Sequence, residues 1–281
     1  MDGMFFFDSD RLMKIADHFS ESYRVAQPFP HVVIDDFVPD EVLQEVVREI
    51  PEPGDRDDWQ RAERTDTIKL SMPRDWALGP VTRQLLNQFN SAAAINFLER
   101  LTGINDLIPD PHYWGGGLHV IDRDGFLKIH ADFNRHPRFD LDRRINALLY
   151  LNPDWRDEWG GHLELWDRTM TQRVQKIAPT FNRLVVFSTT DTSYHGHPDP
   201  LESPIGTRRH ALALYYYSNG RPEEEKSPAH GTLYQARSGD DFDPKTTLPM
   251  RPLRWRDFVP PVASRWRRSI REHWHAVVKT R

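Results

Sequence analysis

GFLKIHADF at residues 125–133 is the stretch that decides the fold and the site of this chain. Apolar residues recur in it with a period of two behind a glycine, which predicts a β-strand. One face of this strand would carry Leu127, Ile129, Ala131 and Phe133, and the other Phe126, Lys128, His130 and Asp132. His130 and Asp132 therefore point into the same space. On an interior face this pair predicts two ligands of one metal ion, whereas on a surface the two residues would be ordinary solvent-exposed polar side chains.

The composition of the chain excludes several classes of protein. The 281 residues are enough for a sizeable core, and the formal net charge of −5 argues against a nucleic-acid partner. The absence of cysteine excludes a disulfide framework, a thiolate-bound zinc and a cysteine nucleophile. Residues 1–7 lack the basic segment of a signal peptide, and no apolar run is long enough for a membrane span. We therefore expect a cytoplasmic protein.

Hydrophobic periodicity changes at about residue 105. Before that point the apolar spacing is helical, which predicts a helical support region over residues 1–104. Its predicted elements are helices at 9–26 and 39–50, a pair of helices over 79–101, a short strand at 31–34 and a polar loop at 51–66. After that point the period becomes two, and strands are predicted at 117–121, 126–133, 145–151, 162–166, 174–177, 183–188 and 210–217.

Helices followed by regularly spaced short strands predict a mainly β fold with flanking helices. We expect residues 105–220 to form a barrel or double-sheet jelly roll, with the helices of 1–104 packed on it in one integrated domain. Residues 221–281 would be a C-terminal extension. Within it, residues 251–281 carry nine Arg or Lys and two acidic residues, which predicts a basic amphipathic helix. This helix would dock on the domain or anchor a partner.

A third ligand candidate lies far along the chain. His195, in TDTSYHGHP at residues 190–198, follows the predicted strand 183–188 and so lies at a strand end, where sites usually occur. Two histidines and one carboxylate make the facial triad of non-haem Fe(II) oxygenases, which leaves coordination positions open. The other candidates for the distal position are His197, His136 and His162.

The last predicted strand carries a polar residue among small ones. Alternation puts Arg209 on the same face as Ala211 and Ala213, and it puts Arg208 on the opposite face. A buried guanidinium beside two alanines needs an anionic partner. Tyr150 is either a second hydrogen-bond donor to that anion or a core tyrosine with a satisfied hydroxyl.

Two further groups of residues bear on the site. Gly160-Gly161 precedes the predicted strand 162–166 and allows a tight turn or a close backbone approach. Four arginines near the H-x-D pair either bind an acidic substrate or belong to a solvated loop: Arg135, Arg138, Arg143 and Arg144.

Six runs of sequence occur in a familiar order. They are GFLKIHAD (125–132), RINALLYLNPDW (144–155), GGHLEL (160–165), NRLVVF (182–187), SYHG (193–196) and RHALALY (209–215). Together they resemble the 2-oxoglutarate/Fe(II)-dependent dioxygenases of the prolyl 4-hydroxylase-like type, over about residues 105–220. This resemblance implies that the barrel is the cupin-like double-stranded β-helix of that family.

The resemblance also implies a reaction and a site. Fe(II), 2-oxoglutarate and O₂ would be required, with ascorbate supporting activity. His130, Asp132 and His195 would bind the iron. Arg209 would pair with the distal carboxylate of 2-oxoglutarate, and Tyr150 would hydrogen-bond to it. A C–H bond of a prolyl or other amino-acid-derived substrate, peptide or small molecule, would be hydroxylated with release of succinate and CO₂.

The chain departs from the family at one contact and leaves its substrate open. Many relatives carry a tyrosine on the strand before H-x-D, where this chain has Val120 or Ile121, so one cosubstrate contact is missing or moved. The loops expected to surround the mouth of the barrel are 134–143, 152–160 and 196–206, with Phe139, Trp155 and Trp159 among their residues.

Three other functions are weighed against amino-acid hydroxylation. The same chemistry could act on a non-amino-acid metabolite such as a natural product or a sugar. A cupin-like module could bind a ligand without catalysis, although a binder needs no open metal face. A zinc hydrolase could use a His₂Asp site, but the chain has no H-E-x-x-H motif.

Overall fold

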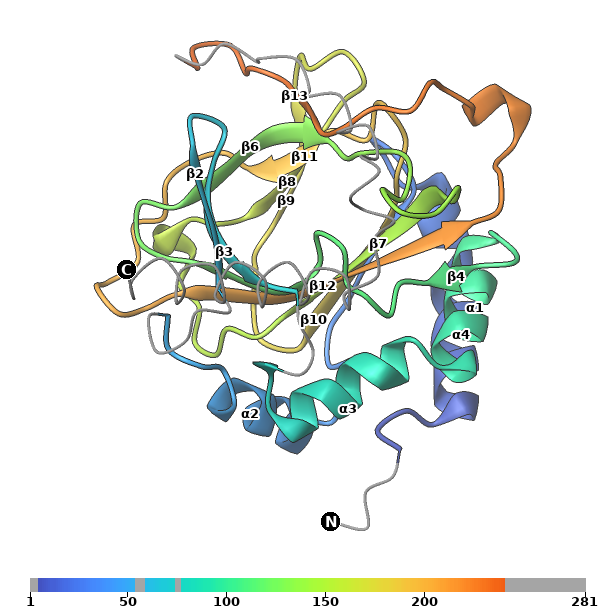
Figure 1. Ribbon diagram of the computed structural model, residues 1–281, viewed down its shortest axis with the longest axis horizontal. Helices are drawn as coiled ribbons and strands as arrows, with labels where there is room; N and C mark the ends of the chain where they lie inside the picture. Colours follow the sequence, from blue (N-terminus) through green and yellow to red (C-terminus); the bar gives the residue numbers. More distant parts are fainter. Residues whose placement is uncertain (1–4, 54–58, 74–76, 241–281) are drawn as a thin grey trace, which may run out of the picture. The chain divides into compact units, whose positions relative to one another are not determined.

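A single, mostly antiparallel sheet that curls back on itself carries the fold (Figure 1). The computed structural model describes residues 5–53, 59–73 and 77–240, all of which belong to one compact unit. The strands in this part of the chain are β1 (His31–Ile34), β2 (Gln60–Arg64), β3 (Thr67–Met72), β4 (Ile108–Pro109), β5 (Gly117–Ile121), β6 (Phe126–Ala131), β7 (Asp142–Tyr150), β8 (Leu163–Trp166), β9 (Arg173–Ile177), β10 (Arg183–Ser188), β11 (His195–His197), β12 (Arg209–Ser218) and β13 (Leu233–Tyr234). The predicted basic helix within residues 251–281 lies outside the described residues.

The strand order explains how the sheet encloses a space. The main path runs β1-β10-β7-β12-β5-β3-β6-β11-β8-β9, and β2, β4 and β13 pair with β3, β12 and β6 beside it. Strand β3 joins the two halves, because Leu70–Met72 pair with β5 while Thr67 and Ile68 pair with β6. One half therefore contains β10, β7, β12 and β5, and the other contains β6, β11, β8 and β9.

The helices cover the outer face of the first half (Figure 1). They are α1 (Ser9–Val25), α2 (Asp40–Arg48), α3 (Pro80–Phe89) and α4 (Ala92–Thr102), and the described chain also has 3₁₀ turns η2 (Asp157–Trp159) and η3 (Glu223–Glu225). Their buried side chains share one core cluster with Leu212, Leu214 and Tyr216 of β12. By alternation, Arg209 and Ala211 of the same strand face the interior of the curled sheet.

Local signals explain where the helices begin and end. The side chain of Asp8 accepts a hydrogen bond of 2.7 Å from the backbone N–H of Arg11 and caps α1. Helix α3 begins with Pro80, and the carboxylate of Glu49, just after α2, accepts hydrogen bonds from the N–H groups of Val81 and Thr82. These contacts give the first hundred residues a defined arrangement against the sheet.

The predicted mainly β fold with flanking helices is confirmed, and the predicted helices and strands agree with the structure to within a few residues. The prediction of a loop at 51–66 is wrong for β2, which pairs with β3 as a hairpin. This hairpin was missed because its burial pattern is almost wholly exposed on β2, so the strand has no apolar alternation. Residues 195–197, expected at a loop mouth, form the short strand β11.

We expect Asn182 to be a main connection between the sheet and α2. Its backbone has φ of 59°, and its side chain is 1% exposed and bonds both the N–H and the C=O of Val38 and the carboxylate of Asp40. Asn182→Ala should lower the free energy of unfolding by about 2–4 kcal/mol, because buried partners lose their bonds and alanine disfavours this backbone conformation. Chemical denaturation measures this change. Asn87→Ala, at an exposed position of α3, is the matched control, and an equal effect of both substitutions would contradict the prediction.

Candidate functional site

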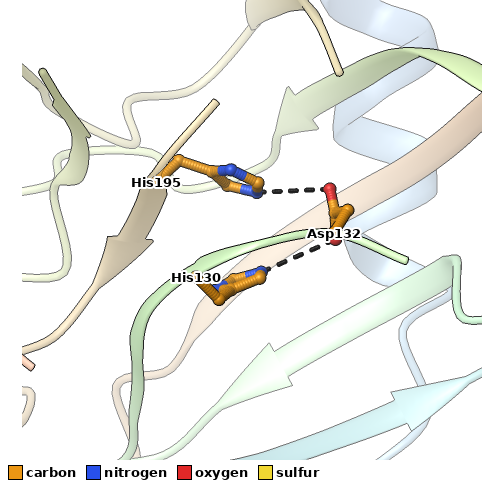
Figure 2. Close-up of side chains that lie close together, drawn as sticks. All are labelled: His130, Asp132 and His195. Carbon is orange, nitrogen blue, oxygen red and sulfur yellow. Dashed lines mark ion pairs between the residues drawn. The ribbon is translucent and has the colours of Figure 1, made fainter. Parts of the chain in front are cut away.

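Three side chains from two strands converge inside the curled sheet (Figure 2). His130 belongs to β6, and Asp132 follows one residue after that strand ends. His195 is the first residue of β11 and lies directly opposite His130 in the register of the two antiparallel strands. One ligand atom from each of the three residues lies within 4.8 Å of the others. This is the cluster that the H-x-D spacing and the distant histidine predict.

Hydrogen bonds to the backbone orient both imidazoles. Nδ1 of His130 donates to the carbonyl of Lys128, and Nδ1 of His195 donates to the carbonyl of Ser193, each at 2.8 Å. Because a carbonyl only accepts, each Nδ1 carries the proton and each Nε2 presents its lone pair. The Nε2 atoms of His130 and His195 lie 3.6 and 3.4 Å from the carboxylate of Asp132. These donors fit a divalent cation between them.

The protonation states of the cluster also suit a metal ion. Burial lowers the pKa of His195 to about 4, so its imidazole is neutral near pH 7. Burial alone would raise the pKa of Asp132. The guanidinium of Arg143, followed by the two imidazoles, outweighs burial and holds that pKa well below its usual range. A neutral imidazole at His195 and an ionised carboxylate at Asp132 are therefore available as ligands.

Arg143 and Asn146 hold the carboxylate of Asp132 in place. Arg143 Nη2 lies 3.0 Å from Asp132 Oδ2, and Asn146 Nδ2 donates to the same oxygen at 2.7 Å. Arg143 also donates to Asn146 Oδ1 and lies 3.5 Å above the ring of Tyr215. The expectation of a solvated loop is wrong for Arg143, which is 1% exposed.

The alternation of inward and outward side chains along β6 is interrupted between Leu127 and His130. Opposite β11, residue His197 pairs with Leu127 and His195 pairs with His130, so β6 has one residue more than β11 over this interval. Leu127 and His130 consequently line the same cavity, although strict alternation placed them on opposite faces. A Cβ on Gly196 would lie 2.7 Å from the carbonyl oxygen of Leu127, so glycine permits this close approach.

The other histidines considered for the metal lie outside the cluster. His197 lines the same cavity, but it is not among the three residues whose ligand atoms converge. His136 lies 3.6 Å from Asp110, and His162 lies 2.6 Å from Asp157. The structure thus brings His195 together with His130 and Asp132 and leaves the three alternatives elsewhere.

The cluster opens into a cavity of about 190 Å³. Arg209 and Tyr150 line it, and Arg209 Nη2 donates to the Tyr150 hydroxyl at 3.2 Å. Arg209 Nε donates to the carbonyl of Gly161 at 2.7 Å. In the described part of the chain no carboxylate pairs with Arg209, which is 5% exposed. Arg208 points elsewhere and binds the carboxylates of Asp122 and Glu52, as the strand alternation predicts.

The sequence did not single out several residues that line this cavity. They are Lys69, His119, Asn146 and Tyr234. Lys69 was missed because no strand was predicted at β3, and Tyr234 belongs to the C-terminal extension, for which no strand was predicted either. Alternation does find His119 and Ile121 on one face of β5, so the interior position of the expected tyrosine is Ile121 rather than Val120.

A segment that was not predicted at the site also lines the cavity. Thr232 and Tyr234 are among its lining residues. Strand β13 pairs with β6, and the centroid of the Tyr234 ring lies 5.5 Å from that of His130. That the loops 134–143, 152–160 and 196–206 surround the mouth of the barrel stays a prediction.

Comparisons with known proteins identify the family of this domain. Residues 116–217 match the family model described as 2OG-Fe(II) oxygenase superfamily. Over these residues the match confirms the family resemblance that the sequence motifs indicated. Prolyl 3-hydroxylase OGFOD1 of Mus musculus is 33% identical over 79 residues, which are 27% of this chain. The match spans only 14% of the length of that relative.

Solved structures share the fold. A prolyl hydroxylase from Trichoplax adhaerens, in complex with a hypoxia inducible factor peptide fragment, gives a TM-score of 0.54 at 16% identity over 74% of this chain and 91% of its own. A prolyl-4-hydroxylase from Pseudomonas putida gives 0.50 at 18% identity over 74% and 100%. At such low identities a structural similarity bears on the fold alone, and it confirms the predicted jelly roll.

Within the described residues, no helix is long and apolar enough to cross a membrane.

We expect metal binding to distinguish His195 from its neighbour His197. His195→Ala removes one of three converging donors and should weaken binding of a divalent cation by more than the roughly 10–100-fold typical of outer-shell changes. His197→Ala is the matched control and should retain most of the affinity. Titration calorimetry with Mn(II) measures both. A larger loss in His197→Ala than in His195→Ala would contradict the assignment.

Proposed function

We propose that the protein is an Fe(II)- and 2-oxoglutarate-dependent dioxygenase that hydroxylates a C–H bond of a prolyl or other amino-acid-derived substrate. The observation that carries the proposal is the convergence of His130, Asp132 and His195 in one cavity with Arg209, a buried cation without a carboxylate partner among the described residues. With Fe(II), 2-oxoglutarate and O₂ bound, such a site oxidises C–H to C–OH and releases succinate and CO₂.

The contacts of individual residues indicate which of them would bind the metal ion. His130, Asp132 and His195 would hold the metal, because their donors are preoriented by Lys128 and Ser193 carbonyls and by Arg143. Three protein ligands on one side leave positions for a chelating cosubstrate and for O₂. Asp132 as the carboxylate ligand favours hydroxylation, since it occupies the position that halogenases of related type leave to halide.

Arg209 would bind the distal carboxylate of 2-oxoglutarate. Its two hydrogen bonds go to the neutral oxygens of Gly161 and Tyr150, so its charge is not compensated by either of them. A buried guanidinium is strongly stabilised by a carboxylate. Tyr150, whose hydroxyl accepts from Arg209, can donate its own proton to the same carboxylate. This pair supports cosubstrate binding in the cavity that the cluster opens into.

The size of the cavity and the relatives support an amino-acid-derived substrate. At about 190 Å³ the cavity is smaller than pockets for drug-sized ligands, which hold roughly 300–1,000 Å³. It suits a small cosubstrate and one inserted side chain. The relatives named above are prolyl hydroxylases, one of them solved with a peptide. A peptide or amino-acid unit is therefore the substrate class that we favour over a sugar.

We also propose a cytoplasmic site of action with ascorbate as a supporting reductant. A chain without cysteine needs no oxidising compartment to form disulfides, which supports the cytoplasm. Ascorbate would keep the metal as Fe(II) between turnovers. Activity with and without ascorbate tests the second point.

Coupled turnover tests the function as a whole. The protein is incubated with Fe(II), ascorbate and 2-oxoglutarate, and succinate is measured with proline-containing peptides, free amino acids and sugars. Substrate-stimulated succinate release with a peptide or amino acid is the expected result, and Asp132→Ala serves as the inactive control. Stimulation by sugars alone would refute the substrate class. The absence of succinate formation and of 2-oxoglutarate binding would refute the function.

Two neighbouring arginines should respond differently to substitution. Arg209→Ala should weaken 2-oxoglutarate binding by about 2–5 kcal/mol, the range for one partner of a buried charge pair. Arg208→Ala is the matched control, because its guanidinium binds Asp122 and Glu52 on the other face. The apparent 2-oxoglutarate requirement of each variant measures the effect. If Arg208→Ala weakens binding more than Arg209→Ala, the assignment is refuted.

Gly161 should be required for the position of Arg209. A Cβ at Gly161, whose φ is 69°, would lie 2.9 Å from Arg209 Cδ and 2.5 Å from Leu201 Cδ2. Gly161→Ala should therefore displace Arg209 and lower 2-oxoglutarate affinity at least tenfold, because roughly 1.4 kcal/mol is already a factor of ten. Gly206→Ala, where φ is 87° and no atom lies within 4 Å, controls for backbone strain alone. Equal affinities of the two variants in titration calorimetry would contradict this role.

A further inference from the structure

Three neighbouring strands place two cations and an isoleucine in one row across the cavity wall. Arg209 of β12 lies opposite Ile121 of β5. The register of β3 against β5, with Leu70 opposite Val120, continues this row to Lys69. All three residues line the cavity. Strands lie roughly 4.8 Å apart, so the row spans about 10 Å between the Cα atoms of Arg209 and Lys69.

Lys69 occupies the point where the sheet changes partner. The residues before it, Thr67 and Ile68, pair with β6, and the residues after it, Leu70–Met72, pair with β5. Its side chain therefore reaches the cavity where the two halves of the sheet meet. Lys69 and Asp132 line the same cavity, and the attraction of the carboxylate acts on the ammonium.

The ammonium of Lys69 has no compensating partner in the described part of the chain. Within residues 5–53, 59–73 and 77–240 it makes neither a hydrogen bond nor an ion pair. Burial lowers the pKa of Lys69 to about 8 despite the attraction of Asp132, and Arg143 and Arg64 add repulsion. A half-buried cation without a counter-charge is costly unless a ligand supplies one.

The charges that line the cavity point to a missing anion. The cations are Lys69, Arg143 and Arg209, and Asp132 is the only carboxylate among the described lining residues. That carboxylate is committed to Arg143 at 3.0 Å. Arg209 and Lys69 thus remain as two cations separated by the apolar side chain of Ile121. A dicarboxylate with methylene groups between its ends complements this row.

We propose that Lys69 binds the oxo-acid carboxylate of 2-oxoglutarate, while Arg209 binds the distal one. The proposal rests on the function proposed above and names a cosubstrate contact specific to this chain. An acidic group on the second substrate is the competing partner for Lys69.

Binding to the protein loaded with Mn(II) under anaerobic conditions tests this without turnover. The two probes are 2-oxoglutarate and 2-oxopentanoate, which keeps the oxo-acid end but lacks the distal carboxylate. Lys69→Met should lower the affinity for both probes by a similar factor of roughly 10–100, the range for a hydrogen bond to a charged group. Arg209→Leu should lower the affinity for 2-oxoglutarate alone. Lys69→Arg should recover part of the affinity that Lys69→Met loses.

Controls separate this inference from the proposed function. Lys14→Met, on the exposed surface of α1, should leave both affinities unchanged, and thermal unfolding checks that each variant folds. If Lys69→Met binds both probes as well as the wild type, the role of Lys69 is refuted and the proposed function stands. If Lys69→Met lowers the affinity only for an acidic substrate, the role of Lys69 in binding 2-oxoglutarate is likewise refuted and the proposed function stands. If the metal-loaded wild type binds no 2-oxoglutarate, both proposals fall.

Discussion

The buried ion pair between Arg143 and Asp132 is the interaction on which the site depends. It keeps the carboxylate ionised in an enclosed space, and Asn146 fixes the same oxygen by a 2.7 Å hydrogen bond. The guanidinium is itself held between the rings of Phe133 and Tyr215, at 4.3 and 3.5 Å. Because a buried pair contributes little net stability on average, its value here is positional. It aims one carboxylate at two imidazoles.

Strand β3 gives the cavity its closed shape and its chemical polarity. By pairing first with β6 and then with β5, it closes the gap between the two halves of the sheet. The helices stabilise one half from outside through a large apolar core, so the interior of the sheet is free to carry polar groups. The inner apolar cluster is small, and it includes Ala211 and Tyr150 beside the cation Arg209. The fold thus separates stability on the outer face from recognition on the inner one.

Much of this arrangement follows from periodicity along the chain. Alternation on β12 distinguishes Arg209 from Arg208 because neighbouring residues of a strand must face opposite sides. The H-x-D spacing places two donors together for the same reason, and the six ordered runs place His195 with them. The start of helix α1 follows from a local signal, the capping residue Asp8. The H-x-D pair, the face of Arg209 and this cap depend on residues within a few positions of each other, so the sequence alone determined them, whereas the place of the distant His195 followed from the family resemblance.

Other features depend on contacts between distant parts of the chain, and only the tertiary structure decided them. The extra residue that turns Leu127 toward the cavity arises from the register of β6 against β11. Lys69 and Tyr234 reach the cavity through the pairing of β3 and β13 with β6, which lies far from each in sequence. Strand β13 has only two residues, which is too short for a pattern, and although Ile68, Leu70 and Met72 alternate in β3, this alternation does not reveal which strands β3 pairs with. Periodicity reports burial on one element, whereas a cavity is built by register between elements.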